Sequence, residues 1–177
     1  HIVSRRQRQM CIRDSNYMER LEQIYQYNID LLQQLEVSFK EWRHEPILDF
    51  ATDVRVAEQL GWTGTHSKSL FLKLKGGGHV LYLTHKDARL DSKAMKQVLG
   101  KRPSICSDEE MIALLGCVPG AVCPFGIPEH IEIVVDSTLY QHSEILYTPG
   151  HPELTIGIAG SSLPKLLQAI PNSVIEM

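Results

Sequence analysis

The sequence predicts a single α+β domain in which a mixed, largely antiparallel sheet is flanked by helices. Segments with helical apolar spacing and segments with strand-like spacing follow one another without a regular βαβ rhythm. The chain has 177 residues with 43% hydrophobic content, which is enough for one buried core. Residues 1–15 are rich in Arg and Gln and show no periodicity, so we expect a disordered or non-native extension there and assign the domain to residues 16–177.

Apolar spacing and turn residues predict the elements of the first half of the domain. Apolar residues three and four apart favour a helix, alternation favours a strand, and Gly or Pro bounds either. The predicted elements are a helix over 17–35, a strand over 37–42, a helix over 50–60 that ends near Gly61, and a hairpin over 68–84 that turns at Gly76-Gly77-Gly78.

Capping residues add the elements of the second half. Ser107 and Glu110 match a capping box, in which each side chain bonds to the other residue's backbone at a helix start. The predicted elements are a short helix from Asp91 to Leu99, a helix over 108–115 closed by Gly116, strands over 131–135, 144–147 and 154–159, and a last helix from Ser161 or Ser162 to Ile170.

The segment 116–126 is the most informative in the chain. It holds three glycines and two prolines together with Val118, Val122 and Phe125, so it is a stiff, half-buried loop rather than a linker. Glycine permits close approach and proline fixes φ, so such a loop can present backbone N–H groups to a carbonyl or phosphate oxygen. Composition alone leaves a second interpretation open, a structural crossover between a helix and a strand.

Charge is distributed unevenly along the chain. The net charge is −3, yet residues 66–102 contain nine Lys or Arg and two Asp or Glu, whereas residues 103–177 contain one Lys and nine Asp or Glu. A local excess of positive charge recruits phosphates even when the total is negative. The alternative is a solvated basic face that the acidic C-terminal third balances.

Lys68 is a candidate site residue because of its parity in the predicted strand. Residues two apart share a face, so Lys68 points the same way as Leu70, Leu72 and Leu74. Its stem can pack along the leucines while the ammonium enters a cleft. Snorkelling of the lysine at the end of the strand is the alternative.

The remaining reactive side chains give weaker indications. His151 lies in a stiff loop between Pro149 and Pro152, where it would suit substrate positioning or be plain polar surface. No GxSxG, Walker A or GxGxxG motif is present, and we expect no cofactor. The four cysteines (Cys11, Cys106, Cys117, Cys123) are expected to be reduced, without zinc-site spacing, so we expect no metal either.

No apolar run approaches the roughly 18 residues of a membrane span, and the N-terminus lacks a signal-peptide pattern, so the expected compartment is the cytoplasm.

Three motifs taken in order resemble one known family. The segment 68–73, the loop 116–126 and Gly150-His151-Pro152 are similar to the YbaK/ProX family of aminoacyl-tRNA deacylases, which is related to the editing insertion of bacterial prolyl-tRNA synthetases. The resemblance covers roughly residues 20–170 and implies the YbaK-type, prolyl-tRNA editing fold. It also implies hydrolysis of the ester that joins a mischarged amino acid to the 3′ end of tRNA.

The resemblance also implies roles for individual residues. The family's Gly-x-x-x-Pro loop falls on Gly120 to Pro124, its strand lysine on Lys68 and the editing histidine of ProX-like members on His151. The amides of Gly120 and Ala121 would polarise the ester carbonyl, and Lys68 would meet the terminal phosphate or ribose. The substrate-binding residues implied are Val122, Cys123, Pro124, Phe125 and Gly150.

In this interpretation no protein nucleophile acts, because the ribose hydroxyl or the substrate amine helps to activate water. Cys123 stands where the family commonly has Ser or Thr, which bears on pocket size, and we assign the cysteines to packing.

The expected function is a free-standing trans-editing hydrolase, foremost for Ala-tRNA(Pro). The implied partners are tRNA(Pro) and, for delivery, prolyl-tRNA synthetase or a translation factor, with no membrane. The alternative is a non-catalytic module on the same fold that binds aminoacyl-tRNA or an amino acid.

Overall fold

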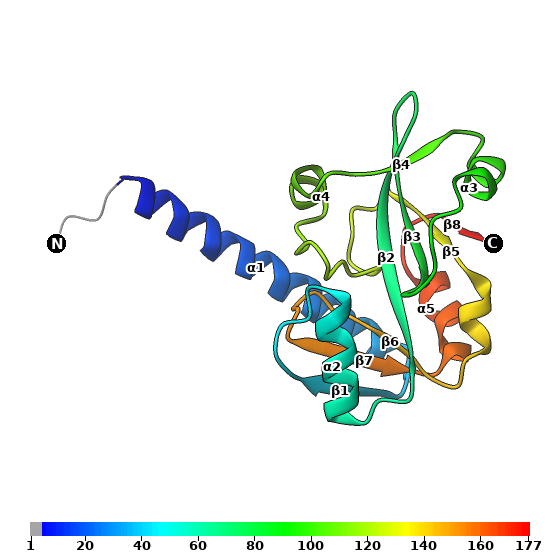
Figure 1. Ribbon diagram of the computed structural model, residues 1–177, viewed down its shortest axis with the longest axis horizontal. Helices are drawn as coiled ribbons and strands as arrows, with labels where there is room; N and C mark the ends of the chain where they lie inside the picture. The colour runs from blue at the N-terminus through cyan, green and yellow to red at the C-terminus, as the bar shows by residue number, and fades with distance from the viewer. Residues whose placement is uncertain (1–4) are drawn as a thin grey trace.

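The computed structural model describes residues 5–177, and side chains from residue 16 onward (Figure 1). A mixed sheet carries helices on both of its faces. The elements in chain order are α1 (Arg5–Gln34), β1 (Phe39–Arg43), α2 (Phe50–Leu60), β2 (Thr65–Leu74), β3 (His79–His85), α3 (Ser92–Leu99), β4 (Pro103–Ile105), α4 (Asp108–Leu115), β5 (Glu132–Val135), the 3-10 helix η1 (Ser137–Gln141), β6 (Ile145–Tyr147), β7 (Leu154–Ile158), the 3-10 turn η2 (Gly160–Ser162), α5 (Leu163–Ala169) and β8 (Val174–Glu176).

The long strand β2 joins the two halves of the sheet. The strand order is β1-β7-β6-β2-β3-β5-β8, and β4 also pairs with β2. At its start β2 pairs in parallel with β6, through Thr65 and His66. Further along it pairs antiparallel with β3, and its last residues pair antiparallel with β4. Lys68 therefore lies just past the point where the pairing of β2 passes from one half of the sheet to the other.

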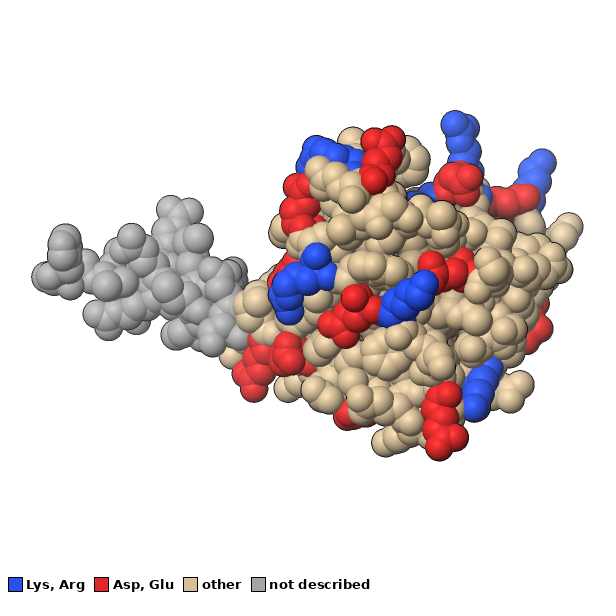
Figure 2. All heavy atoms as spheres, turned by 90° about the horizontal axis from the view of Figure 1, so that it is seen from below, with Lys and Arg blue, Asp and Glu red and all other residues tan. Residues whose placement is uncertain are grey.

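The two faces of the sheet are covered unequally. The main core lies between the sheet and helices α1, α4 and α5, and it includes Leu32, Leu115, Phe125 and Leu166. A smaller cluster on the opposite face packs the sheet against α3 through Met95. The face of β2 that carries Leu70, Leu72 and Leu74 belongs to this smaller cluster. Figure 2 shows the underside of the view in Figure 1, where acidic and basic side chains are interspersed.

Local sequence signals account for most element boundaries. Asp49, Asp91 and Ser107 each accept a backbone N–H at a helix start, as expected for N-caps. Gly61, Gly100 and Gly116 close the same three helices in the left-handed conformation. The predicted α+β fold class with a mixed sheet is therefore confirmed.

Several short elements were not predicted. Strands β4 and β8 have three residues each, and β4 begins at a proline, so neither shows an alternating pattern. Both exist because a longer neighbour offers an edge: β4 pairs with β2, and β8 pairs in parallel with β5. The predicted extension over 1–15 lies outside the residues whose side chains are described, and the backbone of α1 begins at Arg5. Among the described residues, no helix is both long enough and apolar enough to cross a bilayer.

Candidate active site

A cavity of about 280 Å³ lies between the middle of β2, the segment that leads into α2, and the loop 116–126. Lys68 and Gly120 both line it, although they come from distant parts of the chain. A loop that served only as a crossover would not be expected to share a cavity with the strand lysine. The lining residues are Leu48, Asp49, Phe50, Ser67, Lys68, Ser69, Leu70, Lys86, Gly120, Ala121, Val122, Tyr147 and Thr148.

Lys68 has its ammonium held at the edge of this cavity. Its Nζ donates a hydrogen bond to the carbonyl oxygen of Ala88, in the connection after β3. Burial lowers the pKa of Lys68, Asp87 opposes that shift, and Lys86 adds to it. The lysine is thus placed by a backbone carbonyl rather than by a carboxylate partner, which leaves its charge available to an anionic ligand.

Position 120 requires a glycine for two reasons, its backbone conformation and the lack of room for a side chain. Its φ is +84°, a region that side chains with a Cβ rarely adopt. A Cβ at this position would lie 2.3 Å from the backbone oxygen of Leu48. The loop and the segment before α2 therefore touch backbone to backbone at Gly120, and this contact closes one wall of the cavity.

The amide of Ala121 is not free, which corrects one expectation. Its N–H donates to the carbonyl oxygen of Val118 at 2.9 Å and closes a turn within the loop. The amide of Cys123 is directed at the sulfur of Cys117. Within the part of the chain that the structure describes, the amides of Gly120 and Val122 have no protein acceptor. They replace the pair Gly120 and Ala121 as the candidate donors to a ligand.

Three polar side chains of α1 hold the loop in place. Tyr17 donates its hydroxyl to Cys117 O at 2.9 Å, and Arg20 donates to Gly126 O at 3.2 Å. Asn28 is fully buried, and its amide nitrogen lies 3.1 Å from the carbonyl oxygen of Phe125. These residues were missed from the sequence, although an asparagine on the apolar face of a predicted helix, four residues after Ile24, was a usable signal.

Residues 122–125 of the loop lie in two different environments, the wall of the cavity and the main core. Val122 lines the cavity, as expected for a substrate-binding residue. Cys123 and Phe125 are buried in the main core, and Phe125 packs edge-on against Tyr147 with ring centroids 5.5 Å apart. Burial raises the pKa of the Cys123 thiol strongly. Cys123, Pro124 and Phe125 do not line the cavity and support its wall from behind.

His151 lies away from the cavity, contrary to the placement implied by the resemblance. Its ring is buried against α1, and its Nε2 lies 2.7 Å from a carboxylate oxygen of Glu22. The ring of Tyr25 packs beside it at 5.7 Å. Gly150 adopts a φ of +112° and lies against the backbone of Leu21. Both residues attach their loop to α1, because the Pro-bounded turn faces that helix rather than Lys68.

A buried carboxylate beside the cavity was also missed. Asp53, on the inner face of α2, lies 2.8 Å from Nδ1 of His66 and 3.2 Å from Nζ of Lys86. Burial raises its pKa, but the hydrogen bond from His66 and the charge of Lys86 outweigh this, so the net pKa is lowered. Lys86 in turn lines the cavity near Lys68. This ion-pair group holds α2 on β2 and fixes a second cation at the cavity.

Comparisons with known proteins bear on the class of the protein rather than on the geometry of its site. The family model described as the aminoacyl-tRNA editing domain matches residues 49–166. The chain belongs to this family. It is 31% identical over 133 residues to the multifunctional Ser/Thr-tRNA deacylase ProXp-y of Escherichia coli K12, covering 71% of this chain and 77% of the relative. It is 26% identical over 149 residues to the prolyl-tRNA editing protein ProX of Acetoanaerobium sticklandii, covering 80% and 89%.

Solved structures show the same fold at low identity. The crystal structure of the hypothetical protein APE2540 superposes with a TM-score of 0.71 at 20% identity, covering 85% of this chain and 97% of that one. A proposed trans-editing enzyme for prolyl-tRNA synthetase superposes with a TM-score of 0.65, also at 20% identity, covering 86% and 95%. The expected class, an aminoacyl-tRNA deacylase of the YbaK/ProX type, is confirmed by the family match and these relatives.

Proposed function

We propose that this chain is a free-standing, cytoplasmic hydrolase that removes a small mischarged amino acid from tRNA, with Ala-tRNA(Pro) as its first substrate. The observation that carries the proposal is the shared cavity of Lys68 and Gly120. A cation suits the phosphate or ribose of the terminal nucleotide, and a glycine-presented amide suits the ester carbonyl. The family match adds the class of substrate.

The size of the cavity favours a small aminoacyl group. A volume of about 280 Å³ accommodates an amino acid but not an aminoacylated nucleotide. A second hollow of about 630 Å³ adjoins it and shares Phe50 and Lys86. Phe50, whose surface is 62% exposed, offers a ring on which the terminal base can stack. The aminoacyl group would thus enter the smaller cavity and the nucleotide would lie across Phe50.

The proposed chemistry needs no protein nucleophile. Water adds to the ester carbonyl carbon, and the resulting oxyanion accepts hydrogen bonds from the amides of Gly120 and Val122. The proton of water passes to the ribose hydroxyl or the substrate amine. The bond between the carbonyl carbon and the ribose oxygen then breaks, and that oxygen takes up a proton, which gives a free amino acid and uncharged tRNA. Lys68 orients the nucleotide.

A second substrate class is favoured by hydroxyl groups on the cavity wall. Ser69 and Thr148 line the cavity and can hydrogen-bond a hydroxylated side chain. The Escherichia coli relative, named a Ser/Thr-tRNA deacylase, supports this candidate. Seryl- and threonyl-tRNA are therefore the alternative substrates. A synthetase pocket rejects a smaller or isosteric side chain by only about 1–3 kcal/mol, so such errors need removal after charging.

The test is a deacylation panel with tRNA(Pro) charged with Ala, Cys, Ser or Thr. Gly120→Ala is expected to lower kcat/KM about 100-fold or more, since it displaces the wall that carries the oxyanion donors. Gly100→Ala is the matched control: Gly100 also has positive φ, a Cβ there meets nothing within 4 Å, and the residue lines neither hollow. Lys68→Ala is expected to lower kcat/KM about 10- to 100-fold, the value of a charged hydrogen bond. Exposed Lys75→Ala is its control and should change little.

Three outcomes would contradict the proposal. Full activity in both Gly120→Ala and Lys68→Ala would remove the assigned mechanism. Fastest turnover of Ser- or Thr-charged tRNA would move the substrate to the second class. Tight binding of aminoacyl-tRNA without turnover of any member of the panel would support the non-catalytic binding module instead.

A further inference from the structure

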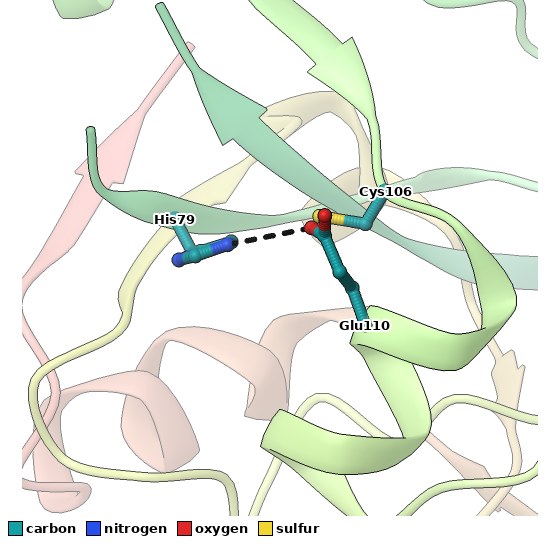
Figure 3. A group of neighbouring side chains, drawn as sticks. All are labelled: His79, Cys106 and Glu110. Carbon is teal, nitrogen blue, oxygen red and sulfur yellow. Dashed lines mark ion pairs between the residues drawn. The ribbon is translucent and has the colours of Figure 1, made fainter. Parts of the chain in front are cut away.

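Three side chains of kinds that bind metal ions lie together outside the cavity described above. They are on the face of the sheet opposite to the smaller cluster that packs against α3. His79 begins β3, Cys106 follows β4, and Glu110 is in the first turn of α4 (Figure 3). Their ligand atoms, one from each residue, all lie within 4.8 Å of one another. We propose that His79, Cys106 and Glu110 form a binding site for one divalent zinc-type ion.

The donor set is selective for this class of ion. Thiolate, imidazole and carboxylate together suit Zn²⁺, whereas Mg²⁺ and Ca²⁺ prefer oxygen donors alone. Tetrahedral zinc with bonds of 2.0–2.3 Å requires ligand atoms about 3.3–3.7 Å apart. The three donors must therefore approach by about 1 Å. Glu110 can supply most of that movement, because its side chain is 43% exposed.

Two of the three residues are positioned by contacts with Phe71. The ring of His79 stacks on Phe71 with centroids 5.2 Å apart and an angle of 10° between the planes. Cys106 is buried, and its backbone N–H bonds to Phe71 O at 3.0 Å. Two of the donors are thus fixed on the same core residue, so an ion would meet a largely preorganised pair.

Glu110 departs from its expected role in the capping box. Ser107 caps α4 as predicted, since its hydroxyl accepts the N–H of Glu110 at 3.2 Å. The carboxylate of Glu110 instead lies 3.8 Å from Nε2 of His79 and 3.6 Å from Nζ of Lys73. At these distances it makes loose ion-pair contacts rather than short hydrogen bonds with those two residues. A hollow lined by His79, Glu110 and Lys73 reaches the first two ligands from solvent, while buried Cys106 does not line it.

A catalytic thiol is the competing interpretation of this group. Burial, followed by the hydrogen bond and the charge of Glu110, raises the pKa of Cys106 to about 11. A nucleophilic cysteine requires a lowered pKa, so the surroundings of Cys106 are wrong for that role. A metal ion would instead displace the thiol proton to solvent and take the sulfur as a ligand.

The site would connect the sheet to the helix before the active-site loop. His79 and Cys106 belong to strand ends, and Glu110 belongs to α4, which runs directly into Gly116 and the loop. An ion bound here would resist separation of α4 from the sheet. The proposal does not depend on the substrate of the cavity, and its test uses no activity assay.

The test is a titration of the full chain with Co²⁺, a spectroscopic substitute for Zn²⁺. A Cys11→Ser background excludes the one cysteine whose side chain the structure does not describe. One Co²⁺ per chain is expected, with a thiolate-to-metal absorption band that Cys106→Ser abolishes. Glu110→Gln and His79→Gln are each expected to weaken binding at least about 10-fold, because loss of even an outer partner of a ligand costs 10- to 100-fold.

Matched variants separate a site from general loss of structure. Glu109→Gln and His130→Gln change an adjacent acid and an exposed histidine, and neither should alter the affinity. Lys73→Gln is expected to strengthen binding about fivefold, since binding of the ion with release of one proton adds one positive charge near the ammonium. Zn²⁺ at about 100 times its dissociation constant is expected to raise Tm by about 5–10 °C. Absence of the thiolate band, or its persistence in Cys106→Ser, would overturn the proposal.

Discussion

Replacing Asn28 with alanine is expected to destabilise the protein by loosening the active-site loop from α1. The Asn28 amide nitrogen lies 2.8 Å from Ile24 O, 3.1 Å from Phe125 O and 3.3 Å from the sulfur of Cys123. The residue is fully buried, so no water replaces these contacts easily. The truncation therefore removes donors from a site where the acceptors remain.

The magnitude follows from those contacts. Each lost hydrogen bond costs about 1 kcal/mol net, and a buried acceptor left without a donor costs about 1–3 kcal/mol. Ile24 O retains the helical bond of its own turn, so the larger cost falls on Phe125 O. A total of about 3 kcal/mol corresponds to a fall in Tm of about 6–12 °C for a domain of this size.

Urea and thermal unfolding of the wild type and of Asn28→Ala measure this cost. Gln26→Ala is the control: within the described part of the chain Gln26 makes a single side-chain hydrogen bond, an exposed one to Asp30 on the same helix, and a change within about 0.5 kcal/mol is expected. Asn28→Asp keeps the shape but loses the amide donors and introduces a buried carboxylate. It should cost more than Asn28→Ala at neutral pH and recover partly in acid, where a protonated carboxyl can donate. If Asn28→Ala and Gln26→Ala unfold at the same temperature, the assigned clamp is wrong.

Two further predictions concern the residues beside the cavity. His151→Gln is expected to lower Tm while it leaves kcat unchanged, because His151 bonds to Glu22 and not to the cavity; loss of turnover at unchanged Tm would restore a catalytic role. Asp53 has a folded pKa below its ordinary value of 3.8, so its contribution to stability is present above that pH and is lost as the pH falls through the folded value. The gap in urea midpoint between the wild type and Asp53→Asn should therefore shrink as the pH falls below about 4. A gap that widens in acid would show that the contacts of Asp53 with His66 and Lys86 do not favour its charged form.

Local signals explain why much of the fold could be predicted. A cap such as Ser107 acts within one turn of its own helix. The run Gly76-Gly77-Gly78 between two apolar strands predicts a turn, and all three glycines adopt positive φ there. Strands β4 and β8 depend on an edge supplied by another segment, which no pattern within three residues can encode. Lys68 lies at the cavity, but so do Ser67 and Ser69, which have the opposite parity, so alternation along the strand does not by itself explain its place.

The parts of the site that could not be predicted depend on packing between distant segments. The amide of Ala121 is occupied because it closes a turn by bonding to the carbonyl oxygen of Val118. The amino-acid composition of the loop does not determine which turn geometry forms. The side to which His151 points is decided by the packing of Gly150 on α1. His79, Cys106 and Glu110 have no recognisable spacing along the chain, since three different elements bring them together.

The clamp on the loop lies outside the segment by which the family is recognised. Tyr17, Arg20 and Asn28 precede residue 49, where the family match begins, yet they hold both ends of the loop. A fragment cut at the boundaries of the family match would retain the cavity-lining glycine but lose the helix that fixes it. The part of the chain that holds this site is thus longer than the segment that the family model matches. Substitutions in α1 can therefore shift the loop although no residue of α1 whose side chain the structure describes lines the cavity.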